Sequence, residues 1–232
     1  MSEFLICLGK HIIGINAENN EVRDICKRYV CDGIPSFSVS ATKDERQREK
    51  KLCPEDTEMS DAYLESLAVY RKICEKMVDY DTVLMHGSVV AVDGEAFLFT
   101  AKSGTGKSTH TRFWREGFGK RAVMVNDDKP LLKLTDDGVL ACGTPWDGKH
   151  RLSTNVCVPL KAICILERGE ENEIRPITAQ EALPMVFQQT YRPKNLARYM
   201  EIIDKLTQRV AFYRLRCNMS PEAAKMAYEA MK

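Results

Sequence analysis

A phosphate-binding pattern stands in the middle of the chain. Residues 101–109 read Ala-Lys-Ser-Gly-Thr-Gly-Lys-Ser-Thr, which fits the phosphate-loop (Walker A) pattern. Gly104 and Gly106 permit backbone conformations in which consecutive N–H groups point at an anion. We expect Lys107 to supply charge to the β and γ phosphates and the Ser108 hydroxyl to bind magnesium. The predicted nucleotide-binding residues are Ser103, Gly104, Thr105, Gly106, Lys107, Ser108 and Thr109.

Two adjacent carboxylates, Asp127 and Asp128, end an apolar run about twenty residues after the loop. In phosphate-loop proteins an acid at this place orders the magnesium shell, so Asp127 joins Ser108 as a predicted metal ligand. The second acid would accept the proton of an attacking hydroxyl. Because neighbours on a strand point to opposite faces, the two acids divide these tasks only if the pleat breaks after the first. A solvated Asp-Asp turn is the alternative interpretation.

Other residues that could take part in a reaction lie before and after this pair. His86, followed by Gly87 and Ser88, is expected in a strand adjoining the loop. It fits either a neighbour of the γ-phosphate or a histidine of the core, and the sequence leaves both open. Lys149 and Arg151, in a run rich in turn residues, fit either closure over the phosphate or plain surface charge.

The elements around the loop follow from residue patterning. An apolar run over 95–100 predicts a strand before the loop, and residues 109–115 predict a helix after it. Asp93-Gly94 separates that strand from another β-prone run over 82–92, which is typical of a tight hairpin. We therefore expect the strand before the loop to be the second arm of an antiparallel hairpin.

The remaining chain alternates between helical and strand patterns. Before the loop we expect a hairpin in 1–16, a helix over 21–30, a strand over 37–40, and a helix capped by Ser60 that runs to Tyr80. The charged run 43–51 is interpreted as a solvated loop or helix face. After the acids we expect strands at 130–134, 139–142, 160–167, 174–177 and 212–217, and helices at 178–189, 195–210 and from 220 onward.

Composition bounds the class of protein. The 232 residues are 44% hydrophobic and 29% charged with a net charge of +1, which describes a globular chain and argues against a nucleic-acid partner. No run of eighteen apolar residues and no leader occur, so we expect a cytoplasmic protein without a membrane partner. Nine cysteines, an odd number without a C-x-x-C pair, indicate reduced thiols rather than a disulfide scaffold. The histidines lack zinc spacing, so no structural metal is expected.

These motifs together resemble a known family. A His-Gly pair in a hairpin, the run 101–108, and Val-Asn-Asp-Asp at 125–128 look like the catalytic domain of HPr kinase/phosphorylase. They resemble the ATP-dependent phosphoenolpyruvate carboxykinases more distantly. The runs 143–146 and 158–162 look more like shorter relatives that accompany peptide-modification gene clusters, some of which phosphorylate a serine hydroxyl.

The resemblance implies a fold and roles. It predicts one α/β domain over 1–232, with a mixed β-sheet, a carboxykinase/HPr kinase-like phosphate-loop core over 81–177, an N-terminal portion over 1–80, a helical portion over 178–232, and a homo-oligomer. His86 and Lys107 correspond to active-site residues, Ser108 to a magnesium ligand, and Asp128, with Asp127 beside it, to a proton acceptor. The family's Arg-Gly-Leu-Gly run is missing, Asp147 is a weak substitute for its metal-binding glutamate, and Thr109 replaces an acid. These departures lend no support to a reverse phosphorylase activity or to HPr as the substrate.

The sequence thus predicts a kinase that uses ATP and Mg²⁺ to phosphorylate a hydroxyl of a peptide, protein or small molecule. One alternative is a non-catalytic nucleotide-sensing or leader-peptide-binding module of the same fold. Another is a carboxykinase-like lyase, which would need a second metal site with His and Lys ligands that the sequence does not make evident.

Overall fold

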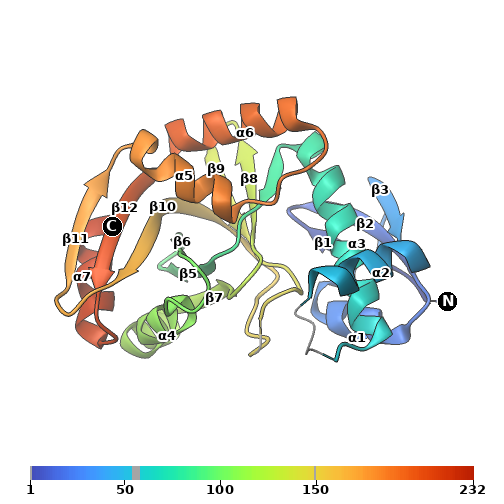
Figure 1. The fold of residues 1–232 in the computed structure, drawn as a ribbon, viewed down its shortest axis with the longest axis horizontal. Coiled ribbons are helices and arrows are strands. Elements are labelled where there is room, and N and C mark those ends of the chain that lie inside the picture. The colour runs from blue at the N-terminus through green and yellow to red at the C-terminus, as the bar shows by residue number, and fades with distance from the viewer. Residues whose placement is uncertain (1, 54–57, 149) are drawn as a thin grey trace.

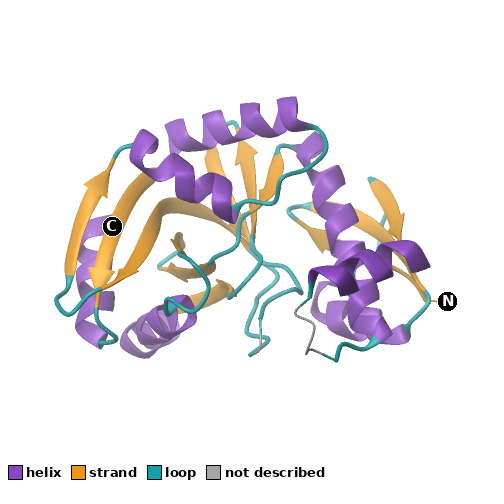
Figure 2. Cartoon of the chain, viewed as in Figure 1, coloured by secondary structure: helices purple, strands orange, loops and turns teal. Residues whose placement is uncertain are grey.

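A strongly curled mixed sheet forms the centre of a single α/β domain (Figures 1 and 2). A computed structural model describes residues 2–53, 58–148 and 150–232. In these ranges the strands form a three-stranded sheet of order β1-β2-β3 and a nine-stranded sheet. The path through the larger sheet is β4-β8-β9-β10-β6-β5-β7, with β12 beside β10 and β11 beside β12.

The N-terminal part combines the small sheet with three helices, of which the second packs on the third. Its strands are β1 (Ser2–Leu8), β2 (His11–Ala17) and β3 (Phe37–Ser40), and its helices are α1 (Asn20–Cys26), α2 (Lys43–Leu52) and α3 (Asp61–Met77). The predicted hairpin is confirmed, because β1 and β2 pair antiparallel around Gly9 and Lys10, both with positive φ. The predicted α3 is confirmed with Ser60 as its cap, and a short 3₁₀ turn carries it on to Tyr80.

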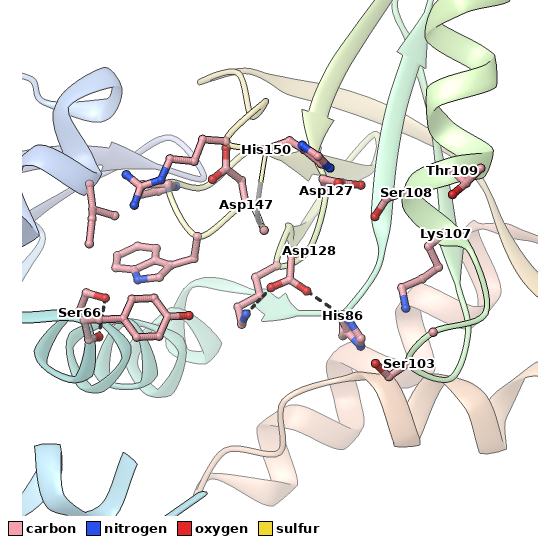
Figure 3. Close-up of a pocket in the computed structure, with 18 of the residues that line it drawn as sticks. Ser66, His86, Ser103, Lys107, Ser108, Thr109, Asp127, Asp128, Asp147 and His150 are labelled. Carbon is pink, nitrogen blue, oxygen red and sulfur yellow. Dashed lines mark hydrogen bonds and ion pairs between the residues drawn. The ribbon is translucent and has the colours of Figure 1, made fainter. Parts of the chain in front are cut away.

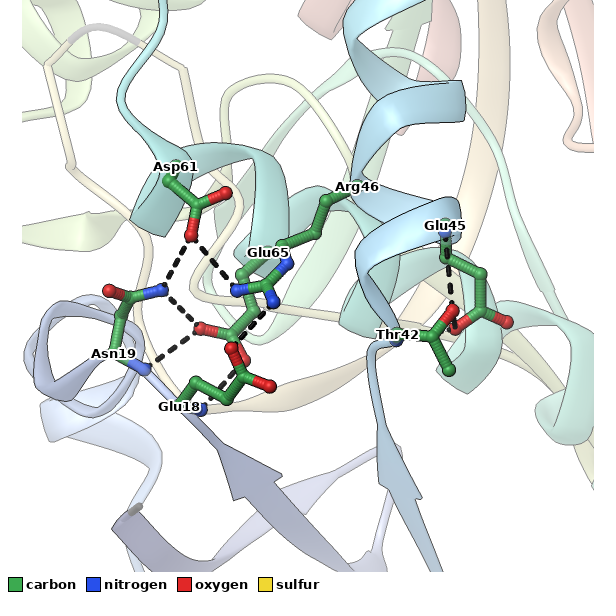
Figure 4. Close-up of polar contacts among 7 residues, drawn as sticks. All are labelled: Glu18, Asn19, Thr42, Glu45, Arg46, Asp61 and Glu65. Carbon is green, nitrogen blue, oxygen red and sulfur yellow. Dashed lines mark hydrogen bonds and ion pairs between the residues drawn. The ribbon is translucent and has the colours of Figure 1, made fainter.

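A buried carboxylate ties α3 to the rest of this part (Figure 4). Glu65 is fully buried and accepts hydrogen bonds from the Glu18 and Asn19 amides at 2.7 and 2.9 Å and from the Asn19 side chain at 2.7 Å. Arg46, 3% exposed, contacts Glu18 at 2.5 Å and Asp61 at 2.9 Å. The charged run 43–51 is therefore the helix α2, and most of it is a solvated helix face, as expected. Arg46 and Glu49 are the exceptions, because they are buried and pair with partly exposed side chains from other segments.

The large sheet carries the residues of interest at its strand ends. Its strands and the helix between them are β4 (Thr82–Leu84), β5 (Ser88–Val92), β6 (Glu95–Thr100), α4 (Lys107–Phe118), β7 (Ala122–Asn126), β8 (Leu131–Thr135), β9 (Gly138–Cys142) and β10 (Cys157–Arg168). Strand β10 is parallel to β6 and to β12, whereas β5 is antiparallel to β6 and β7. The predicted hairpin at Asp93-Gly94 is confirmed, with Val92 opposite Glu95.

The C-terminal elements cover the two faces of this sheet. They are β11 (Glu173–Ile177), α5 (Ala179–Gln189), α6 (Leu196–Arg209), β12 (Ala211–Cys217) and α7 (Pro221–Met231). Helices α5 and α6 pack on one face, and α4 and α7 pack on the other (Figure 1). A third core, shared by the small sheet, α3 and strands β8 and β9, joins the N-terminal part to the rest.

One predicted strand is interrupted. The run 82–92 forms β4 and β5 with a break at residues 85–87, because β4 pairs with β8 whereas β5 pairs with β6 and β7. The break is held by other segments: the His86 amide donates to the Gln189 carbonyl at 2.7 Å and the Gly87 amide to the Asp128 carbonyl at 3.1 Å. His86 therefore lies in the break, and the prediction that it lies inside a strand is wrong.

The cysteines differ from expectation at one place. A disulfide joins Cys142 at the end of β9 to Cys157 at the start of β10, which face each other across the antiparallel pair. The other seven cysteines are free thiols. In the ranges that the structure covers, no helix combines the length and apolar character required to cross a membrane.

Candidate active site

The glycine loop, residues 101–106, connects β6 to α4 and presents an open helix N-terminus. Gly104 and Gly106 have φ values of +76° and +116°, a backbone region that residues other than glycine rarely adopt. Gly106 caps α4 without any side-chain hydrogen bond to the first turn. The first amides of a helix lack intrahelical partners, so this end of α4 offers N–H groups and a positive dipole to an anion.

Lys107, the first residue of α4, lies in the wall of a cleft of about 720 Å³ (Figure 3). Its side chain is 9% exposed, and its ammonium donates to the Ala101 carbonyl at 3.3 Å. Burial lowers the pKa of Lys107, and the charges of Asp128 and Asp127 act in the opposite direction. The ammonium is thus partly desolvated, makes one long hydrogen bond and lines the cleft, which would suit the binding of an anion.

Asp127 lies beside the helix start. Its Oδ1 accepts a hydrogen bond from Ser88 at 2.6 Å, and the Ser88 hydroxyl is 2.8 Å from that of Thr111. Burial raises the pKa of Asp127, while hydrogen bonds from Ser88 and Ser108 lower it in part. In Figure 3 the Ser108 side chain lies near the Asp127 carboxylate, at the place of the predicted metal pair.

Asp128 points the other way, toward His86. Its Oδ1 is 3.2 Å from the His86 Nε2, and its other oxygen contacts the Lys129 ammonium. Burial by itself would raise the pKa of Asp128, but the hydrogen bond from His86 and the charge of Lys129 lower it to about 2. On its far side the His86 ring contacts the Gln189 Oε1 through Nδ1 at 2.8 Å. The two neighbouring acids thus face different partners.

A buried asparagine produces this divergence. Asn126, the last residue of β7, is fully buried, and its Oδ1 accepts from the Asp128 and Lys129 amides at 2.8 and 2.7 Å. Its amide nitrogen donates to the carbonyl and hydroxyl of Thr144, both at 3.0 Å. Such a turn after the strand breaks the pleat, so the acids no longer alternate across the sheet.

The half of the cleft away from the glycine loop is built from distant segments. Ile25 of α1, Tyr63 and Ser66 of α3, and Trp146 and Arg151 of the 143–156 loop line it. The Trp146 indole stacks on Tyr70 with centroids 4.0 Å apart and an interplanar angle of 10°. In Figure 3, Ser66 lies across the cleft from Lys107. The cleft has the size of a small-ligand site.

Most of the predicted site residues meet in this cleft. Its lining includes Ser103, Gly104, Gly106, Lys107, Ser108, Thr109, His86, Asp127 and Asp128. Thr105 instead lines a separate small cavity with Met219, and its hydroxyl donates to the Lys102 carbonyl at 2.9 Å. Arg151 lies at the edge of the cleft, while Lys149 falls outside the described residues.

Asp147, the weak substitute for the family's metal-binding glutamate, lines the cleft and has partners of its own. Its Oδ2 accepts from the Ser153 amide at 2.7 Å and lies 4.0 Å from Arg28. Among the described residues, no group of three His, Cys, Asp or Glu side chains is placed to hold a metal ion. Ser108 and Asp127 stay the predicted metal ligands.

Several positioning residues escaped the sequence reasoning. Asn126 and Ser88 are fully buried and hold the two acids, and Gln189, 7% exposed, holds His86. An asparagine between an apolar strand and a double acid is a signal for a side-chain-stabilised turn. Gln189 carried no comparable signal, because it lies more than a hundred residues from the histidine that it contacts.

The comparisons identify the family. The family model described as SynChlorMet cassette protein ScmC matches residues 52–226, about three quarters of the chain. The chain belongs to the ScmC family. The ScmC match contains every cleft residue named above except Ile25.

Other comparisons add little. A comparison with curated proteins gives no match. Among solved structures, the Hpr(Ser) kinase/phosphatase from Coxiella burnetii is similar, with 11% identity over 64% of this chain and 97% of that chain at a TM-score of 0.38. The two chains are thus only distantly alike.

Proposed function

We propose that this ScmC-family chain is a kinase that transfers the γ-phosphoryl group of ATP to a hydroxyl, with Mg²⁺ as its metal. One observation carries the proposal. A single cleft brings together an open helix N-terminus, the Lys107 ammonium and a carboxylate, Asp128, that is held ionised by His86 and Lys129. Anion binding and proton acceptance are the two tasks of phosphoryl transfer to an alcohol.

The glycine loop supplies the phosphate site. A triphosphate along residues 103–108 would receive the free amides of the first turn of α4 and the dipole of that helix. Lys107 would exchange its single 3.3 Å bond to the Ala101 carbonyl for the phosphate oxygens. Because its ammonium is already largely desolvated, the contact with a phosphate forms at a smaller desolvation cost than on an open surface.

The donor set beside the loop suits magnesium. Mg²⁺ is bound in proteins through one or two carboxylates, with waters and substrate phosphates completing its shell. The neighbouring Ser108 hydroxyl and Asp127 carboxylate match that pattern. When bound there, magnesium neutralises charge on the β and γ phosphates.

Asp128 would accept the acceptor's proton. As the hydroxyl oxygen bonds to the γ-phosphorus, the bond from that phosphorus to the bridging oxygen breaks, ADP leaves and the hydroxyl proton moves to Asp128. With a pKa of about 2, Asp128 is ionised at neutral pH and is a weak base. It therefore takes the proton late, when bonding to phosphorus has made the hydroxyl acidic.

His86 would hold Asp128 in place. Its Nε2 contacts Asp128 and its Nδ1 contacts Gln189, so the ring is clamped from both sides. The histidine thus has a defined task in the proposed mechanism rather than a place in the apolar core.

Label transfer from γ-labelled ATP tests the function. Wild type with magnesium and a serine-containing peptide, or with water as a substitute acceptor, is expected to release or transfer label. Lys107→Ala is expected to lose this activity, and Asp136→Asn, at an exposed turn acid, serves as the matched control. Equal label transfer by wild type and Lys107→Ala would refute the proposal. Nucleotide binding with no turnover, unaffected by Asp128→Asn, would favour a nucleotide sensor instead.

A further inference from the structure

A second large cavity lies on the other side of α3. This edge groove, about 830 Å³ in volume, runs between strand β3, helices α2 and α3, and the segment 191–195. Helix α3 contributes Tyr63 and Ser66 to the cleft, but Ala68, Arg71 and Glu75 to the groove. At 3.6 residues per turn these two sets lie on opposite faces of the helix, so the groove is a separate site.

An open strand edge forms one wall of the groove. In the described part of the chain, β3 pairs with β2 and with no other strand, and Ser38, Val39 and Ser40 line the groove. Every second residue of an edge strand directs its N–H and C=O away from the sheet, which makes the edge a template for another extended chain. The groove thus combines a backbone edge, in which the Lys72 ammonium already donates to the Ser40 carbonyl at 2.8 Å, with space beside it.

Apolar side chains provide a floor for a partner's side chains. Val39 and Ala68 are buried at the base of the groove, and Tyr191 is half-buried in its wall. Leu52, at the C-terminal end of α2, is 69% exposed. A strand laid beside β3 would direct alternate side chains toward these residues.

Charge decides which kind of peptide fits. Three of the groove's acids are already engaged: Glu49 by Arg71, Glu45 by Lys72 at 2.9 Å, and Glu75 by the Tyr191 hydroxyl at 2.6 Å. Within the described residues, three groove cations have no acidic side chain within ion-pair distance: Arg48, Lys76 and Lys194. Among the groove's acids, Glu75 and Asp79 have no cationic side chain within that distance in the described residues. The three unpaired cations therefore outnumber the two unpaired acids, and the charge left in the groove is positive.

We propose that the edge groove binds an extended, acidic peptide segment that adds to β3 as a further strand. Main-chain hydrogen bonds to β3 would hold the segment, alternate apolar side chains would cover Val39 and Leu52, and acidic side chains would meet the unpaired cations. The site is independent of the proposed phosphoryl transfer, because none of its residues lies in the cleft.

Fluorescence anisotropy with labelled decapeptides tests this site. The probe set alternates Val, Leu or Phe with Glu; matched sets carry Lys in place of Glu, or N-methyl groups on alternate backbone amides. We expect saturable binding of the acidic set only, both to wild type and to Lys107→Ala. The double variant Arg48→Glu/Lys76→Glu should bind at least about tenfold more weakly, whereas Lys225→Glu, at an exposed position on α7, should bind like wild type.

The same experiment contains the contrary outcomes. Equal binding of acidic and basic sets, unchanged binding after N-methylation, or wild-type affinity in the double variant would overturn the proposal. So would the absence of saturable binding up to about 1 mM, the weakest affinity expected of a specific contact. Hydrogen exchange of the full chain supplies a second readout, since bound peptide should slow the outward amides of β3. Loss of label transfer without loss of peptide binding would concern only the proposed kinase activity.

Discussion

The two halves of the cleft differ in how the chain builds them. The phosphate half comes from one stretch, residues 101–109, together with the acids after β7. The far half, formed by Ile25, Tyr63, Ser66, Trp146 and Arg151, draws on α1, α3 and the 143–156 loop. The residues of the first half lie close together in the sequence. Those of the second half come together only when the N-terminal part packs on the large sheet.

The supports of the two halves differ as well. Behind the phosphate half, α4 buries Trp114 against Phe97 and Phe99, and its indole donates to His110 at 3.1 Å. The far half depends on the stack of Trp146 on Tyr70 and on the Cys142–Cys157 disulfide that joins the two ends of its loop. The phosphate half is thus supported by one buried helix face, whereas the far half depends on contacts between distant segments.

The largest expected effect lies at the junction of the two halves. Asp128→Asn removes the proton acceptor but leaves the glycine loop intact, so we expect kcat to fall by about 10²- to 10⁴-fold. Nucleotide affinity should change little, because Asp128 faces His86 rather than the loop. Steady-state kinetics and calorimetric nucleotide titration measure both quantities. If nucleotide affinity fell as strongly as kcat, Asp128 would belong to the metal site, and the two acids would not have separate roles.

His110, which packs behind the phosphate half, should make the free energy of unfolding depend on pH. Burial lowers the pKa of His110 to about 4, below the usual 6.5, so between these values the unfolded chain binds the extra proton. Stability should therefore fall as pH drops from about 6.5 to 4, by about 3 kcal/mol in total. His110→Gln, which keeps an acceptor for the Trp114 N–H, should flatten this slope in denaturant titrations. An unchanged slope would show that His110 does not carry the dependence.

A smaller effect is expected from the residue that clamps His86. Gln189→Ala should lower kcat about tenfold, near 1.4 kcal/mol, because the ring loses its Nδ1 partner while the backbone bond between these residues remains. Gln189→Glu retains an acceptor and should recover most of the rate. Equal defects in both variants would indicate a packing role, and the shape of the pH–rate profile separates the two readings.

The smallest effect concerns the far half. Tyr63→Ala removes a partly exposed wall of the cleft, so we expect the KM of a peptide acceptor to rise by a few-fold with kcat and nucleotide affinity unchanged. Tyr213→Ala, on β12 and outside the cleft, is a control for the loss of a tyrosine side chain elsewhere in the chain. A fall in kcat without a rise in KM would mean that the two halves are not separable.

The predictability of each part follows this division. The hairpin before the loop, the capped helix α3 and the divergence of Asp127 from Asp128 could be predicted, since all depend on local glycine, capping or pleat geometry. The break at residues 85–87 could not, because a continuous apolar run gives no sign that its two ends pair with different strands.

The other features that the sequence did not predict also depend on contacts between distant segments. Gln189 reaches His86 only through the packing of α5, and the burial of Arg46 in the charged run depends on Glu18 and Asp61 from other segments. The pairing of Cys142 with Cys157 depends on the register of β9 against β10. None of these contacts leaves a short-range pattern in the sequence.

The most direct test of the central claim is a calorimetric titration with a non-hydrolysable ATP analogue and magnesium. We predict saturable binding to wild type and to Asp128→Asn, and a loss of at least about tenfold in affinity for Lys107→Ala. Comparable binding by Lys107→Ala and wild type, or no binding by the wild-type chain, would contradict the assignment of the glycine loop as the triphosphate site.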